Sequence, residues 1–191
     1  MAIRTIREEG DEILRKNSKI VKEITPRTDE LIDDMIETLH VANGVGLAAV
    51  QVGVLKRLCV ISIDPYDMIA ADEDDDLSEI DFEAEFGEDF KFKHTDGEDI
   101  VIINPQIEVL GEETQTGNEG CLSLPGKFGM VTRPDHIMLR AFDRNLAPYE
   151  LEAKGLLARA ICHECDHMDG ILYTDKVEGE VFDASLEESE E

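Results

Sequence analysis

Negative charge is concentrated in two segments of this 191-residue chain. The formal net charge is −27, from 45 acidic and 18 basic residues. Residues 64–99 contain 16 acids and two lysines, and residues 178–191 contain seven acids and no lysine or arginine. The remainder carries −6, and 42% of the chain is hydrophobic, so a core can form without these segments. We predict a single domain over 1–191, with an acidic insertion at about 64–99 and an acidic C-terminal tail at about 178–191.

The composition excludes several classes of function. Phosphate contacts require clustered cations, so we expect no direct nucleic-acid binding and no docking on anionic lipid. No apolar run reaches the ~20 residues of a membrane span. The first residues, MAIRTIREEGDEIL, contain no apolar stretch typical of a signal peptide. Together with only four cysteines, these features predict a cytoplasmic protein in a reducing compartment, and they leave its oligomeric state open.

Strand and helix signals alternate along the chain outside the acidic segments. Two runs rich in β-branched residues, 57–63 and 100–104, flank the insertion, and short strands are predicted at 101–104, 106–110 and 136–142. One helix is predicted to begin with Thr28 as its N-cap and to end at Asn43-Gly44. A second is predicted from about Leu156 to Asp169, with Gly170 as its C-terminal stop.

Within the insertion, Phe82, Phe86 and Phe90 recur every four residues. This spacing favours one face of a short helix. Such a face either packs on the parent domain or binds a partner protein.

The second predicted helix carries a metal-binding pattern, His163-Glu164-Cys165-Asp166-His167. Residues four apart share a helix face, so both imidazoles can reach one metal ion. Glu164 lies about 80° to one side of the direction in which the two histidines face the metal. It can therefore exchange a proton with a water molecule at the metal without being a ligand. Cys165 points away and is predicted in the core, while Asp166 is predicted to orient neighbouring groups. This pattern favours metal-assisted hydrolysis.

A catalytic site of this type needs a third protein ligand. Glu187 lies 20 residues beyond His167, a spacing that suits an HExxH endopeptidase, but it falls in the acidic tail. Cys121 is the other candidate, because a thiolate binds divalent cations and the glycines at 120 and 126 give its loop conformational latitude.

Three separated motifs resemble those of the peptide deformylase family. Residues 44–51 read GVGLAAVQ, residues 119–123 read EGCLS, and residues 163–167 read HECDH. Their order and spacing are similar to the family pattern across nearly the whole chain outside the insertion and tail. The resemblance implies an α+β fold in which antiparallel β-sheets pack around a central α-helix that carries the HExxH motif.

The resemblance also implies a metal site and a base. Cys121, His163 and His167 would hold one divalent ion, with Fe²⁺ expected and Zn²⁺, Ni²⁺ or Co²⁺ as substitutes. Glu164 would deprotonate the attacking water and pass the proton to the departing amine. The substrates would be N-formyl-methionyl peptides and nascent chains, from which the formyl group is hydrolysed and released as formate.

The other implied roles concern the substrate. The side-chain amide of Gln51 and the backbone N–H of Leu122 would stabilise the oxyanion. Gly46 and Val45 would bind the substrate, with Gly46 allowing its backbone to approach closely. The alternatives are an HExxH endopeptidase and a catalytically silent homologue that binds a partner through the acidic insertion.

Overall fold

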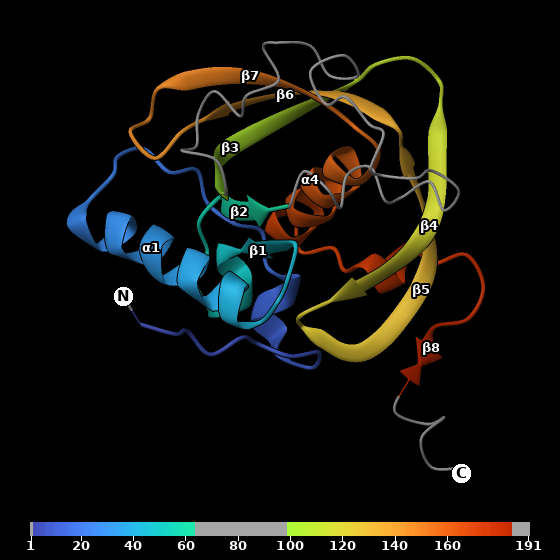
Figure 1. Cartoon of the computed structure of the whole chain (residues 1–191). Helices are drawn as coiled ribbons and strands as arrows, with labels where there is room; N and C mark the ends of the chain where they lie inside the picture. Colours follow the sequence, from blue (N-terminus) through green and yellow to red (C-terminus); the bar gives the residue numbers. More distant parts are fainter. Residues whose placement is uncertain (1, 64–98, 185–191) are drawn as a thin grey trace, which may run out of the picture.

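Two antiparallel β-sheets lie on either side of one helix in the computed structural model, which describes residues 2–63 and 99–184 (Figure 1). The larger sheet has the strand order β1 (Gly46–Ala48), β2 (Leu58–Ser62), β3 (Asp99–Val109), β6 (His136–Phe142) and β7 (Pro148–Lys154). The smaller sheet has the order β4 (Thr114–Cys121), β5 (Leu124–Pro134) and β8 (Phe182–Asp183). The predicted α+β class is therefore confirmed.

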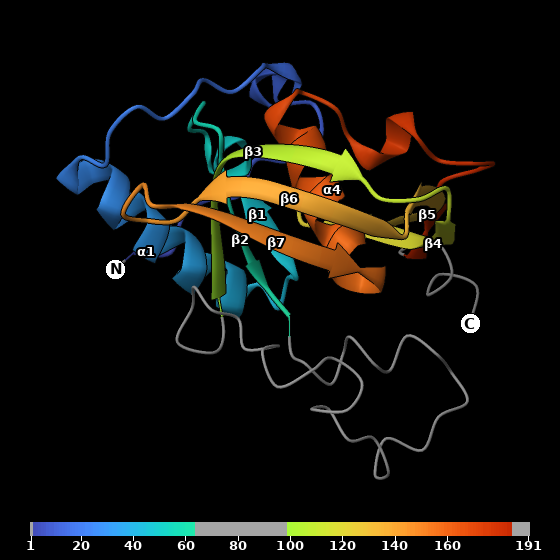
Figure 2. The same ribbon diagram turned by 90° about the horizontal axis from the view of Figure 1, so that it is seen from above.

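The helix between the sheets is α4 (Gly155–Met168), and it contacts strands of both (Figures 1 and 2). Its apolar residues, among them Leu157 and Ile161, pack against Ile102 and Leu139 of the larger sheet. The prediction of a helix over 156–169 is confirmed to within one residue at each end. Gly170 follows with φ of +74°, a conformation in which glycine is favoured.

The helix α1 (Pro26–Val41) covers the β1–β2 end of the larger sheet. The prediction of Thr28 as its N-cap was wrong: the cap is Thr25, whose hydroxyl accepts from the backbone N–H of Thr28 at 3.3 Å. Pro26 at the first helical position explains the earlier start, because its fixed φ suits a helix and it has no N–H to satisfy. Three short 3₁₀ turns complete the described elements: η1 (Glu12–Arg15), η2 (Ala49–Val52) and η4 (Tyr173–Asp175).

The two strands predicted at 101–104 and 106–110 are one strand, β3, with a register irregularity between Ile103 and Gln106. Asn104 lies in this irregularity with φ of +52°. Its side-chain amide accepts from the N–H of Val21 at 2.9 Å and donates to the Val21 carbonyl at 2.8 Å. The irregularity therefore anchors the N-terminal segment. The strand predicted at 136–142 is confirmed as β6.

Most of the acidic insertion, including Phe82, Phe86 and Phe90, and the tail beyond residue 184, with Glu187, lie outside the described residues. Within 2–63 and 99–184, no helix combines the length and apolarity that crossing a membrane requires.

A buried carboxylate on α1 anchors the start of the chain. Asp34, 2% exposed, accepts a hydrogen bond from the N–H of Ala2 at 2.6 Å and another from Nε of Arg4 at 2.9 Å. The Ala2 hydrogen bond and the Arg4 guanidinium lower the pKa of Asp34 below its usual 3.8, although burial opposes them. The ionised form is therefore favoured in the folded protein.

We expect Asp34→Asn to lower the free energy of unfolding at pH 7 by about 1–3 kcal/mol, because it removes a charged acceptor. A folded-state pKa below the unfolded one contributes stability above pH 4, and this contribution is lost as the pH falls through the folded-state value. The difference in free energy of unfolding between wild type and variant should therefore decrease below about pH 4. Urea unfolding between pH 3 and pH 7 measures this difference. A difference that stays constant over this range would contradict a lowered pKa of Asp34 in the folded protein.

Candidate metal centre and active site

The predicted site residues gather around one pocket of about 490 Å³ between the two sheets. Its walls come from the segment before β1, from β4 and β5, and from α4. Seven of the eight predicted site residues line it: Val45, Gly46, Gln51, Cys121, Leu122, His163 and Glu164. The eighth, His167, is fully buried beside it. Among the described residues, no histidine or cysteine lines a larger hollow of about 840 Å³ over β3, β6 and β7.

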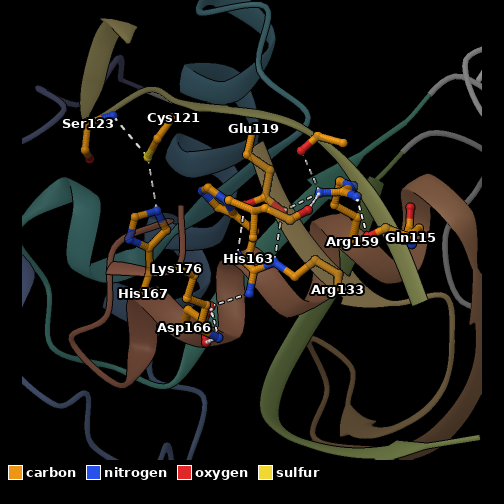
Figure 3. Close-up of polar contacts among 12 residues, drawn as sticks. Gln115, Glu119, Cys121, Ser123, Arg133, Arg159, His163, Asp166, His167 and Lys176 are labelled. Carbon is orange, nitrogen blue, oxygen red and sulfur yellow. Dashed lines mark hydrogen bonds and ion pairs between the residues drawn. The ribbon is translucent and has the colours of Figure 1, made fainter. Parts of the chain in front are cut away.

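Three side chains converge as a set of metal ligands. The donor atoms of Cys121, His163 and His167 all lie within 4.8 Å of one another. The Cys121 Sγ is 3.1 Å from Nε2 of His167 (Figure 3). Ligands on a tetrahedral ion with bonds of 2.0–2.3 Å would be about 3.3–3.8 Å apart. One thiol and two imidazoles at this spacing fit a transition-metal ion.

The orientation of His163 is set by a carboxylate on β4. Its Nδ1 is 2.9 Å from Oε2 of Glu119, which leaves Nε2 to face the ligand group (Figure 3). Burial acts to raise the pKa of Glu119, but hydrogen bonds with Arg133 and His163 lower it to about 2. Glu119 is therefore an ionised acceptor. Such a partner fixes the tautomer of a ligating histidine and increases its basicity.

Glu119 is in turn held by two buried arginines. Arg133 donates to both of its oxygens, at 2.9 and 2.8 Å, and Arg159 donates to Oε1 at 2.8 Å. Arg133 also pairs with Asp166 of α4, and Asp166 pairs with Lys176 at 2.6 Å (Figure 3). This buried network connects β4, β5 and α4 at the metal site. Asp166 contacts Arg133 and Lys176, and its expected role in orienting neighbouring groups stays a prediction.

Gln51 and Ser123 lie on the other side of Cys121. The Gln51 Oε1 accepts from the N–H of Ala48 at 2.7 Å, so its Nε2 faces the ligands. That Nε2 is 3.2 Å from the Ser123 hydroxyl and 3.5 Å from the Cys121 Sγ. The N–H of Ser123 also donates to this sulfur at 3.4 Å (Figure 3). Two N–H donors, from Gln51 and Ser123, therefore point at the Cys121 sulfur.

Glu164 lies beside the ligands and packs against β1. It is 4% exposed, and burial raises its pKa to about 7. Within the described residues, its buried Oε2 has no hydrogen-bond partner. A Cβ at Gly46 would lie 2.6 Å from the other oxygen, Oε1. The lack of a side chain at Gly46 therefore makes room for Glu164 itself.

The comparisons with known proteins agree with this geometry. A model of the polypeptide deformylase family matches residues 3–182. The chain belongs to the polypeptide deformylase family. Members of this family are metalloenzymes that remove the N-formyl group from nascent peptides.

Relatives of this family match over almost the full length. The peptide deformylase of Lachnoclostridium phytofermentans is 48% identical over 191 residues, covering 100% of this chain and 99% of its own. That of Agathobacter rectalis is 46% identical over 192 residues and covers 100% of both chains. The crystal structure of Ehrlichia chaffeensis peptide deformylase in complex with actinonin is similar with a TM-score of 0.75 at 31% identity, over 93% of this chain and 90% of that one.

Sequence reasoning missed four residues of this deformylase site. Glu119 and Ser123 stand inside the 119–123 motif but received no role, and Arg133 and Arg159 were not singled out. A carboxylate two residues before a candidate cysteine ligand was the available signal for Glu119. The prediction that Cys165 is part of the core is confirmed, since it packs with the cluster between α4 and the larger sheet.

We expect Arg133→Met to destabilise the fold by about 3–5 kcal/mol, because it leaves the carboxylate of Glu119 without its bidentate partner. Metal affinity should fall roughly 10–100-fold, since the orientation of His163 depends on Glu119. The matched control is Lys176→Met, which breaks a partly exposed pair and should cost about 0–1 kcal/mol. Denaturant unfolding and competition with a metal indicator measure both quantities, and equal effects in the two variants would contradict the network.

A second prediction concerns Gly46, whose φ lies outside the left-handed region. Gly46→Ala should therefore strain no backbone but displace Glu164, lowering the rate of deformylation by about 10²-fold. Metal content and the unfolding midpoint should stay close to wild type. Formate release together with elemental analysis tests this, and a fully active, metal-loaded variant would contradict it.

Proposed function

We propose that this chain hydrolyses the N-formyl group from the N-terminal formyl-methionine of newly made polypeptides and releases formate. The observation that carries the proposal is the convergence of Cys121, His163 and His167 beside the buried carboxylate of Glu164 in one pocket. We also propose that the whole chain, 1–191, acts as a single catalytic domain.

The proposed cofactor is one divalent ion held by Cys121, His163 and His167. Fe²⁺ is our proposal, with Zn²⁺, Ni²⁺ or Co²⁺ as substitutes, because a thiolate with two imidazoles suits this group of metals. When bound, such an ion acts as a Lewis acid toward the formyl oxygen and makes water more acidic. The N–H groups of Ser123 and Gln51 lie 3.4 and 3.5 Å from the sulfur and support its position among the ligands.

Glu164 is the proposed base. Its Oε2 carries no hydrogen bond within the described residues, so it is available to take a proton from the attacking water. The same carboxyl group then passes this proton to the amine that leaves as the formyl C–N bond breaks. Gly46, directly against Glu164, supports this geometry by leaving the carboxylate its space.

The developing oxyanion requires hydrogen-bond donors. We propose the Nε2 of Gln51 and the backbone N–H of Leu122, since both residues line the pocket beside Cys121. Losing one such donor typically costs ~10²–10³ in turnover. Val45 and Gly46, which also line the pocket, are the proposed contacts for the substrate.

The proposed partners are formyl-methionyl peptides and nascent chains, without direct nucleic-acid binding. A cytoplasmic location is part of the proposal because nascent chains emerge there. The four cysteines, all free thiols, are consistent with a reducing compartment.

The experiment that tests this function is formate release from formyl-Met-Ala by protein purified without oxygen and loaded with Fe²⁺. Oxygen is excluded because a thiolate ligand is prone to oxidation. We expect turnover that a chelator stops and added metal restores. Folded, metal-loaded protein that releases no formate would overturn the proposal.

The roles of base and ligand predict different outcomes for two variants. Glu164→Gln should lower kcat by about 10²–10⁴-fold while the protein keeps a stoichiometric metal ion, because only proton transfer is lost. Cys121→Ala should lose the metal as well as activity. Steady-state kinetics with elemental analysis distinguishes them. Retained turnover in the first variant, or retained metal in the second, would refute the corresponding role.

A further inference from the structure

Three exposed apolar side chains lie together on one face of the smaller sheet. Phe128, Met130 and Phe182 are 37%, 44% and 47% exposed. Phe128 on β5 is the registered antiparallel partner of Phe182 on β8, so their side chains share a face. Met130 follows two residues after Phe128 along the same strand and points to that face as well. We call these three residues the apolar ledge.

The ledge is continuous with the pocket. On the other side of β5, Phe128 is registered with Gly120 of β4 and Met130 with Asn118, and both β4 residues line the pocket. A Cβ at Gly120 would lie 2.7 Å from Cε1 of Phe128, so the phenyl ring lies over the Gly120 backbone. Phe128 itself lines the pocket. The pocket wall and the ledge are therefore parts of one surface.

The ledge has a polar limit along the sheet. The next residue of β5 on this face, Thr132, shares a hydrogen bond with Thr116 of β4 at 2.7 Å. Exposed apolar patches bordered by polar groups mark interaction sites. Since none of the three ledge residues is charged, this patch fits apolar side chains rather than acidic or basic ones.

We propose that the apolar ledge binds apolar side chains of the substrate polypeptide, two or more positions after the formyl-methionine. This inference rests on the proposed function. A newly made polypeptide is far longer than a pocket of about 490 Å³ can hold, so the chain must leave across the rim. Phe128 forms part of that rim, and Met130 and Phe182 extend it outward along β5 and β8. The ledge therefore adds a preference for apolar residues beyond the formyl-methionine.

The test compares formylated pentapeptides, formyl-Met-Ala-Ala-Ala-Ala, that carry a single Leu or Ser at the third, fourth or fifth position. Burying roughly 50 Å² of apolar surface corresponds to about a fivefold to tenfold preference in kcat/KM for Leu at the position that contacts the ledge. In the double variant Met130→Ser/Phe182→Ser this ratio should fall to about 1. Because the readout is a ratio within one preparation, partial inactivation of a variant does not alter it.

The matched control is Val109→Ser, which removes a side chain of β3 that is 50% exposed and belongs to the larger sheet. It should keep the wild-type ratio. A Leu/Ser ratio that is unchanged in the double variant, or near 1 at every position in wild type, would overturn the proposed binding by the ledge. Turnover of formyl-Met-Ala would still support the proposed function in either case.

Two further outcomes also decide the proposal. A wild-type dimer that dissociates in the double variant, with the ratio unchanged, would assign the ledge to a second copy of the chain and overturn the inference. Sedimentation velocity at assay concentration measures this. Absence of formate from every peptide, formyl-Met-Ala included, would overturn the proposed function and the ledge with it.

Discussion

The guanidinium of Arg133 is buried between carboxylates from two different elements, Glu119 of β4 and Asp166 of α4. A buried cation is tolerated only where its donors are satisfied, and here both anions are needed. The smaller sheet is thereby fastened to the helix that carries the histidines. Because Glu119 also holds His163, the same charges that join the sheet to the helix orient a metal ligand.

Rigid elements supply the ligands from opposite sides of the pocket. Cys121 stands at the end of β4, while His163 and His167 stand one turn apart on α4. A site built on strands and a helix holds its geometry better than one built on loops. The packing is close enough that a glycine is required opposite Glu164. Another glycine, Gly120, lets the ring of Phe128 lie over its backbone at the pocket.

Local patterns predicted some elements and failed for others, for identifiable reasons. The helix of His163 was predicted to within a residue because its apolar period and its terminal glycine are local signals. Thr28 was mistaken for the cap because two threonines compete, and Pro26 places the start of the helix three positions earlier. β4, with the sequence TQTGNEGC, was not recognised as a strand: it is polar, and it is stabilised by pairing with β5.

The sequence by itself determined that His163 and His167 share one face, since a four-residue spacing on a helix places side chains one turn apart. Local patterns left two candidates for the third ligand, Glu187 and Cys121. The described fold places Cys121 with the two histidines. Only the tertiary structure decided that Glu119 and Arg133 support this site and that Gly46 faces Glu164. Such contacts join residues far apart in the chain, and their energies depend on burial, which no local pattern specifies.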